Sequence, residues 1–131
     1  MTKTLINYLT IILFLIPFSL LIVDDKVLFP FITTKAIFFR ILVSLGLIFA
    51  LWLYLLNPNT FPKRNYLFLA IVLFFLVNVI ATIFSIDPYR SFWGNAERME
   101  GTWSLFFYLS YFFLLFTLFQ FNPKAKKTIF Y

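Results

Sequence analysis

The sequence of 131 residues contains no cysteine and no histidine, only three glycines, and five acidic residues against eleven Lys and Arg. Without cysteine there is no disulfide and no thiol nucleophile, and without histidine there is no imidazole base. A zinc site built from Cys and His is excluded for the same reason. We therefore expect no metal and no cofactor in this protein.

Charged residues of any kind are scarce, at 12% of the chain, whereas hydrophobic residues make up 63%. Soluble domains have about 25% and about 45 to 50%, respectively. The 21 Phe, 7 Tyr and 3 Trp also exclude a disordered chain, because disordered segments are poor in aromatics. The composition therefore predicts an integral membrane protein. Its net charge of +6 fits the basic cytoplasmic loops of such proteins, and we expect no nucleic-acid partner.

Four stretches have the roughly 20 apolar residues needed to cross about 30 Å of hydrocarbon as a helix. They are residues 5–23, 36–56, 66–86 and 102–121. The longest connection between them, 87–101, has 15 residues and leaves no room for a soluble domain. We expect one all-α, four-span module over residues 1–131, with the first span kinked at Pro17. That span is longer than the apolar part of a signal peptide and precedes no cleavage site, so we expect it to be retained.

The distribution of Lys and Arg at the helix ends predicts the orientation in the membrane. One side receives six such residues and the other receives five. The larger set includes the tail, so we expect both termini and residues 57–65 on the cytoplasmic side. The larger set is Lys3, Lys63, Arg64, Lys124, Lys126 and Lys127, and the smaller set is Lys26, Lys35, Arg40, Arg90 and Arg98.

Polar and small residues inside the spans are few. Gly46 and Ala50 are one helical turn apart and permit close helix packing. Asn78 lies within the third span, and we expect its amide to hydrogen-bond to a neighbouring helix. No Asp or Glu lies in any span, so a proton relay built on an intramembrane carboxylate has no residues to use.

The first segment on the expected outer side, residues 29–40, enters the second span. Thr33 or Thr34 is placed to cap the exposed N–H groups of that helix, and Lys35 and Arg40 bracket its start. Arg40 lies about 6 to 8 Å below the start of the span on helical rise. Two interpretations remain open. Arg40 is either a functional intramembrane charge or a side chain that extends to the interface along its apolar stem.

The second outer segment, residues 85–101, predicts a short helix between the third and fourth spans. Asp87 followed by Pro88 is typical of a helix start, and Gly94 is typical of a helix end. Tyr89, Phe92 and Trp93 have the i, i+3, i+4 spacing of one helical face. We therefore expect this helix to lie flat at the membrane interface with its aromatic face among the headgroups.

Arg90 and Arg98 in this segment also have two interpretations. They are either locally paired charges beside an aromatic belt or ligands of an anion. A guanidinium group makes charged, bidentate contacts with phosphate, and such contacts are stronger at a half-desolvated interface than in bulk water. Arginines beside an aromatic surface suit a lipid-linked phosphate better than a soluble anion.

These outer segments resemble sequences of the bacterial O-antigen ligase and polymerase family, membrane glycosyltransferases that use glycans linked to polyprenyl diphosphate. The matching stretches are FPFITTK (29–35) with FFR (38–40), and DPYRSFWGN (87–95) with ERMEG (97–101). The second is the more specific, and the spacing of the spans agrees along the chain. Thr34 departs from the family, whose members often have glycine there.

The resemblance implies metal-independent transfer of an oligosaccharide from its diphosphate carrier at the outer face of the bacterial inner membrane, with the acceptor left open. Its implied diphosphate contacts are Lys35, Arg40, Arg90 and Arg98, and its implied platform for prenyl or sugar is Tyr89, Phe92 and Trp93. The family's catalytic loop, with Arg and His, lies downstream of these segments. The resemblance therefore implies an N-terminal portion that is inactive alone and whose catalytic residues are unknown. Its partners would be the remainder of a split ligase or further copies of the chain.

The alternative, from a different functional class, is a complete small four-helix membrane protein that binds a partner or anionic lipid and catalyses nothing. Further spans and a His-bearing outer loop, in the same reading frame or an adjacent gene, would favour the ligase interpretation.

Overall fold

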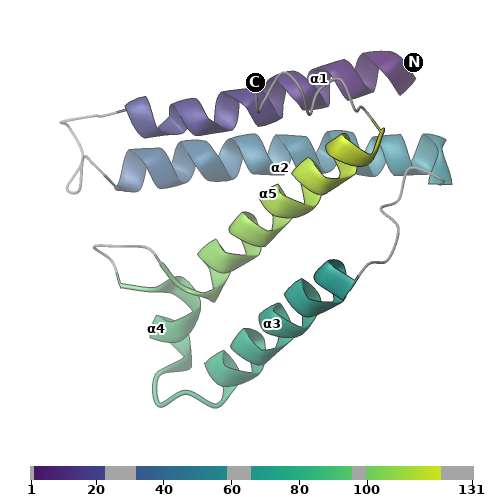
Figure 1. Cartoon of the computed structure of the whole chain (residues 1–131). Coiled ribbons are helices and arrows are strands. Elements are labelled where there is room, and N and C mark those ends of the chain that lie inside the picture. The colour runs from purple at the N-terminus through teal and green to yellow at the C-terminus, as the bar shows by residue number, and fades with distance from the viewer. Residues whose placement is uncertain (1, 23–31, 59–65, 96–99, 122–131) are drawn as a thin grey trace.

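The structure is a computed structural model that describes residues 2–22, 32–58, 66–95 and 100–121. Helices and turns make up these residues, and no strand occurs among them (Figure 1). Four helical stretches, Lys3–Leu21, Thr33–Leu56, Tyr66–Ile83 and Thr102–Phe119, are long and apolar enough to cross a bilayer. The chain is thus an all-α integral membrane protein, as predicted. The elements are α1 (Thr2–Leu15), the 3-10 helix η1 (Ile16–Leu21), α2 (Thr33–Leu56), α3 (Tyr66–Ile83), α4 (Pro88–Trp93) and α5 (Thr102–Phe121).

The core lies where α1, α2 and α5 meet. Helices α1 and α2 run antiparallel side by side, α5 crosses them, and α3 lies along α5 (Figure 1). Leu9 and Leu13 of α1, Val43 of α2, and Leu114 and Leu118 of α5 are buried there. At one end of the bundle η1 and α3 end while α2 and α5 begin, and we call this the site end.

Small residues allow the close contact of α2 with its neighbours, as the spacing of Gly46 and Ala50 predicts. Both residues are buried in the core. A Cβ atom on Gly46 would lie 2.9 Å from Cδ1 of Leu114 and 3.9 Å from Cγ2 of Ile12. Glycine therefore leaves room at this position for side chains of both α5 and α1.

The first span is not one continuous α-helix. The α-helix ends at Leu15, and η1 begins at Ile16 with Pro17 in its first turn. Proline lacks the N–H that would continue the hydrogen-bond ladder, and its ring clashes with the carbonyl one turn earlier. The irregularity predicted at Pro17 is therefore present, as a change of helix type.

The predicted threonine cap of α2 is wrong. The helix begins at Thr33, three residues before the predicted start, and the residue in the cap position is Ile32, with no side-chain hydrogen bond. Thr33 and Thr34 are helical residues of the first turn. Neither occupies the position before the helix from which a side chain caps the exposed N–H groups. The earlier start places Lys35 in the first turn of α2. The other end agrees with the prediction, since α2 ends at Leu56 before Asn57.

The prediction for Asn78 is also wrong. Its Nδ2 atom donates to the carbonyl of Phe74, 2.8 Å away in the same helix. A side-chain hydrogen bond from α3 to α5 occurs one turn later, between the hydroxyls of Thr82 and Thr102. Helix α3 ends at Ile83, three residues before the predicted boundary, and contains no buried residue.

Candidate functional site

Helix α4 forms from local signals, as predicted. The Asp87 carboxylate accepts a hydrogen bond from the backbone N–H of Arg90 at 3.0 Å, and Pro88 is the first helical residue. Gly94 ends the helix at φ 80°, and its N–H donates to the Arg90 carbonyl at 2.8 Å. Glycine is suited to this left-handed backbone region because it has no Cβ. The sequence thus sets both ends of α4.

Removing the Asp87 cap is expected to loosen α4. The Asp87→Ala variant leaves the Arg90 N–H without its acceptor, at a cost of about 1 kcal/mol to the helix. Hydrogen exchange of the α4 amides should accelerate about fivefold, whereas Asp87→Asn, which keeps an acceptor oxygen, should exchange at nearly the native rate. Equal exchange in all three proteins would contradict this role of the Asp87 side chain.

Two glycines, Gly94 and Gly101, allow the backbone before α5 to contact the C-terminal end of α4. A Cβ atom on Gly101 would lie 2.2 Å from the carbonyl oxygen of Phe92 and 2.4 Å from the nitrogen of Gly94. The two glycines therefore allow the chain to return to within contact distance of the end of α4. Thr102 also donates to the Ser91 carbonyl at 3.3 Å. This contact fixes α4 at the beginning of α5.

The predicted aromatic platform is part of a larger cluster. The ring centroid of Phe92 lies 5.2 Å from that of Trp93 and 5.8 Å from that of Trp103, and Tyr89 is 76% exposed beside Trp93. Trp103 in turn contacts Phe107 at 5.3 Å. The sequence analysis missed these two α5 residues, although their i, i+4 spacing is the same signal that it used in α4. That α4 lies in the membrane interface stays a prediction.

A cavity of about 390 Å³ lies at the site end between η1, α2 and the beginning of α5. We call it the cation cavity, because Lys35 and Arg40 of α2 line it, together with Glu100 and Ser104. Nη2 of Arg40 donates to Oγ of Ser104 at 2.7 Å, and the guanidinium carbon lies 6.0 Å from the centroid of the Phe107 ring. Arg40 therefore has partners within the protein.

The electrostatics of this cavity favour an anion. Two cationic side chains and one carboxylate line it, and Lys35 and Arg40 are both partly buried. Lys35 lies in the first turn of α2, where the helix dipole adds positive potential. Charges in such a half-desolvated position interact more strongly than charges in bulk water. The charge of the lining therefore favours an anion over a cation in this cavity.

The structure brings together two of the four predicted cationic contacts, Lys35 and Arg40. Arg90 lies on exposed α4, where its Nε and Nη2 donate to Oδ1 of Asn95 at 3.1 and 2.8 Å, and it is not among the residues that line the cation cavity. Arg98 lies outside the described residues. Ser104 was missed, because only the crossing of α2 and α5 places it beside Arg40.

A second cavity, of about 460 Å³, lies between α3, α4 and α5, and we call it the polar cavity. Its lining includes Asn78 and Thr82 of α3, and Glu100, Ser104 and Tyr108 at the beginning of α5. The last three residues also line the cation cavity. The two cavities are therefore adjacent.

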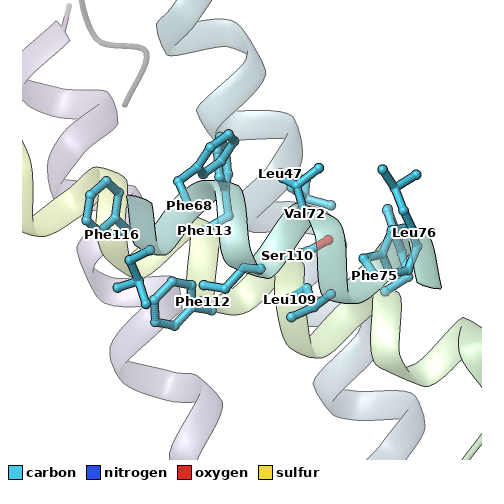
Figure 2. Close-up of a pocket in the computed structure, with 13 residues that line it drawn as sticks. Leu47, Phe68, Val72, Phe75, Leu76, Leu109, Ser110, Phe112, Phe113 and Phe116 are labelled. Carbon is cyan, nitrogen blue, oxygen red and sulfur yellow. The ribbon is translucent and has the colours of Figure 1, made fainter. Parts of the chain in front are cut away.

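An apolar groove of about 250 Å³ lies further along α3 and α5 (Figure 2). Phe68, Val72 and Phe75 of α3 and Phe112 and Phe113 of α5 point into it. Ser110 is the one polar residue among those that line it. Such a surface suits lipid or prenyl chains.

Comparison of the chain with protein-family models, with curated proteins and with solved structures finds no match. The described part of the site end thus combines a cavity lined by two cations, an adjacent polar cavity, and aromatic and apolar surfaces close by.

Proposed function

We propose that the site end binds the diphosphate of a polyprenyl-linked glycan, as the N-terminal membrane portion of an O-antigen ligase-like glycosyltransferase. The observation that carries the proposal is that two partly buried cations line one cavity at the site end. Lys35 and Arg40 come from the first segment, and Glu100 comes from the second. The hydrogen bond from Arg40 to Ser104 joins residues 64 positions apart in the chain.

The proposed chemistry is the transfer of an oligosaccharide to an acceptor while the carrier diphosphate leaves. Negative charge grows on the leaving diphosphate, and Arg40 and Lys35 stabilise it there. The aromatic cluster and the apolar groove accommodate the prenyl chain. Catalytic groups that act on the acceptor belong to downstream sequence in this proposal, so these residues alone bind the carrier without transferring the glycan.

The proposed location is the bacterial inner membrane, with both termini in the cytoplasm and the site end at the outer face. A glycan on a polyprenyl carrier is available to a transferase at that face. Lys3, at the other end of the bundle, then lies beside anionic cytoplasmic headgroups.

The second candidate is a non-catalytic membrane protein that binds an anionic lipid or a partner. The observation that favours it is the exposure of α3, which has no buried residue and leaves a full helical face for another helix. An anionic phospholipid would use the same two cations as a diphosphate. Competition between these headgroups separates the two candidates.

The test is binding of farnesyl diphosphate to the protein in phosphatidylcholine nanodiscs, with farnesol and phosphatidylglycerol as competitors. We expect farnesyl diphosphate to bind and neither competitor to displace it. Lys35→Gln should weaken binding about threefold, the effect of one partly exposed charge. Lys3→Gln, at the opposite end of the bundle, is the matched control and should leave the affinity unchanged. Equal binding of farnesol, or displacement by phosphatidylglycerol, would overturn the proposal.

A further inference from the structure

We infer that the polar cavity holds the sugar attached to the diphosphate that occupies the cation cavity. This inference rests on the proposed function and names the group bound beside the anion. It concerns the cavity between α3, α4 and α5, to which the proposed function assigns no role.

The first step is the adjacency of the two cavities. Glu100, Ser104 and Tyr108 line both, so the two cavities adjoin at the beginning of α5 and just before it. A diphosphate held by Lys35 and Arg40 would therefore place one of its two substituents beside these three residues. In the inferred complex, the sugar extends along them into the polar cavity.

The second step is the difference in charge between the cavities. The cation cavity is lined by Lys35 and Arg40, whereas neither Lys nor Arg is among the residues that line the polar cavity. Among the described residues, the polar cavity therefore offers no counter-ion to a second phosphate. Neutral hydroxyl and amide groups dominate instead: Asn78, Thr82, Ser91, Thr102, Ser104 and Tyr108.

The third step is the fit of these groups to a polyhydroxylated ligand. Hydroxyl side chains both donate and accept hydrogen bonds, an amide offers both functions on separate atoms, and the Glu100 carboxylate accepts them. A sugar ring presents the same mixture of donors and acceptors. The lining therefore matches a sugar better than it matches an acyl or prenyl chain, which the apolar groove fits instead.

The fourth step concerns Asn78. Its Nδ2 atom donates to Phe74 in the same helix, while its Oδ1 atom accepts no hydrogen bond within the described residues. Transfer of an amide into an apolar medium without partners is unfavourable. Asn78 lines the polar cavity one turn before Thr82, so its Oδ1 atom is available to accept a hydrogen bond from a sugar hydroxyl.

The experiment compares farnesyl diphosphate with farnesyl diphospho-N-acetylglucosamine, each titrated into the protein in phosphatidylcholine nanodiscs. We expect the sugar-bearing probe to bind about tenfold more tightly. Asn78→Leu and the smaller Asn78→Ala should each remove most of this gain while leaving the affinity for farnesyl diphosphate unchanged. Val77→Leu is the matched control on α3, because Val77 is 63% exposed and does not line the cavity.

Equal affinity of the native protein for the two probes would overturn the inference and leave the proposed function standing. Failure of both probes to bind would overturn the two together. An equal loss for both probes in both Asn78 variants would show that Asn78 acts on the fold of the site rather than on the sugar, and would also overturn the inference.

Discussion

Replacing Gly101 by alanine should detach α4 from α5 and destabilise the protein by about 3 kcal/mol, at the upper end of the usual cost of overpacking. The added Cβ atom would lie 2.2 Å from the Phe92 carbonyl oxygen and 2.4 Å from the Gly94 nitrogen. Both are backbone atoms, so no change of side-chain rotamer relieves the clash. The backbone contact between Gly94 and Gly101 must open. The hydrogen bond from Thr102 to the Ser91 carbonyl is then lost as well.

Gly46→Ala is the matched control for Gly101→Ala, because it makes the same chemical change inside a helix. Its Cβ atom would lie 2.9 Å from Cδ1 of Leu114, the end of a flexible side chain. Alanine also favours the helix by about 1 kcal/mol relative to glycine, which offsets the crowding. Thermal unfolding in detergent, followed by tryptophan fluorescence, should separate the two variants clearly. Equal unfolding temperatures would show that the glycine contact beside α4 does not stabilise the protein.

Replacing Arg40 by glutamine should weaken the binding of farnesyl diphosphate at least tenfold. The Arg40 guanidinium lies in the cation cavity, donates to Ser104 at 2.7 Å and is partly buried. Charge-assisted contacts of this group with a bound phosphate would therefore be poorly screened, and a tenfold change corresponds to about 1.4 kcal/mol. Arg40→Lys should lose less, because it keeps the charge but not the planar fork of donors.

The Ser104→Ala variant distinguishes the effect of the Arg40 charge from the effect of the hydrogen bond that positions its side chain. This variant removes the hydrogen-bond acceptor but keeps both cations, so its affinity should fall less than that of Arg40→Gln. Titration at low and high salt gives a second readout, since the native protein should lose affinity with salt and Arg40→Gln should show a shallower dependence. Unchanged affinity of Arg40→Gln for farnesyl diphosphate would show that Arg40 does not bind the diphosphate.

The sequence predicts those parts of the fold that depend on local signals. The four spans follow from apolar length, and α4 follows from the Asp87 cap, Pro88 and the Gly94 end. These signals lie within a few residues of the structure that they determine. Gly46 was also predicted correctly, because close helix packing needs a small residue wherever the partner helix lies.

The pairing of distant elements did not follow from the sequence. Arg40 contacts Ser104 because α2 and α5 pack against each other, and no local pattern in the sequence records that packing. The prediction for Asn78 assumed that an amide must bond across helices, whereas a carbonyl in the preceding turn accepts its hydrogen. The threonine cap was wrong because the first turn of α2 extends three residues further back, to Thr33.

The most direct test of the account maps where a polyprenyl diphosphate lies. A farnesyl diphosphate analogue with a photoreactive group beside the diphosphate is irradiated with the protein in nanodiscs, and the labelled peptides are identified by mass spectrometry. We predict labelling within residues 33–40 and 100–108, reduced by Arg40→Gln and abolished by excess farnesyl diphosphate. Labelling spread evenly over the lipid-facing helices, or concentrated at the opposite end of α1 and α2, would contradict the account.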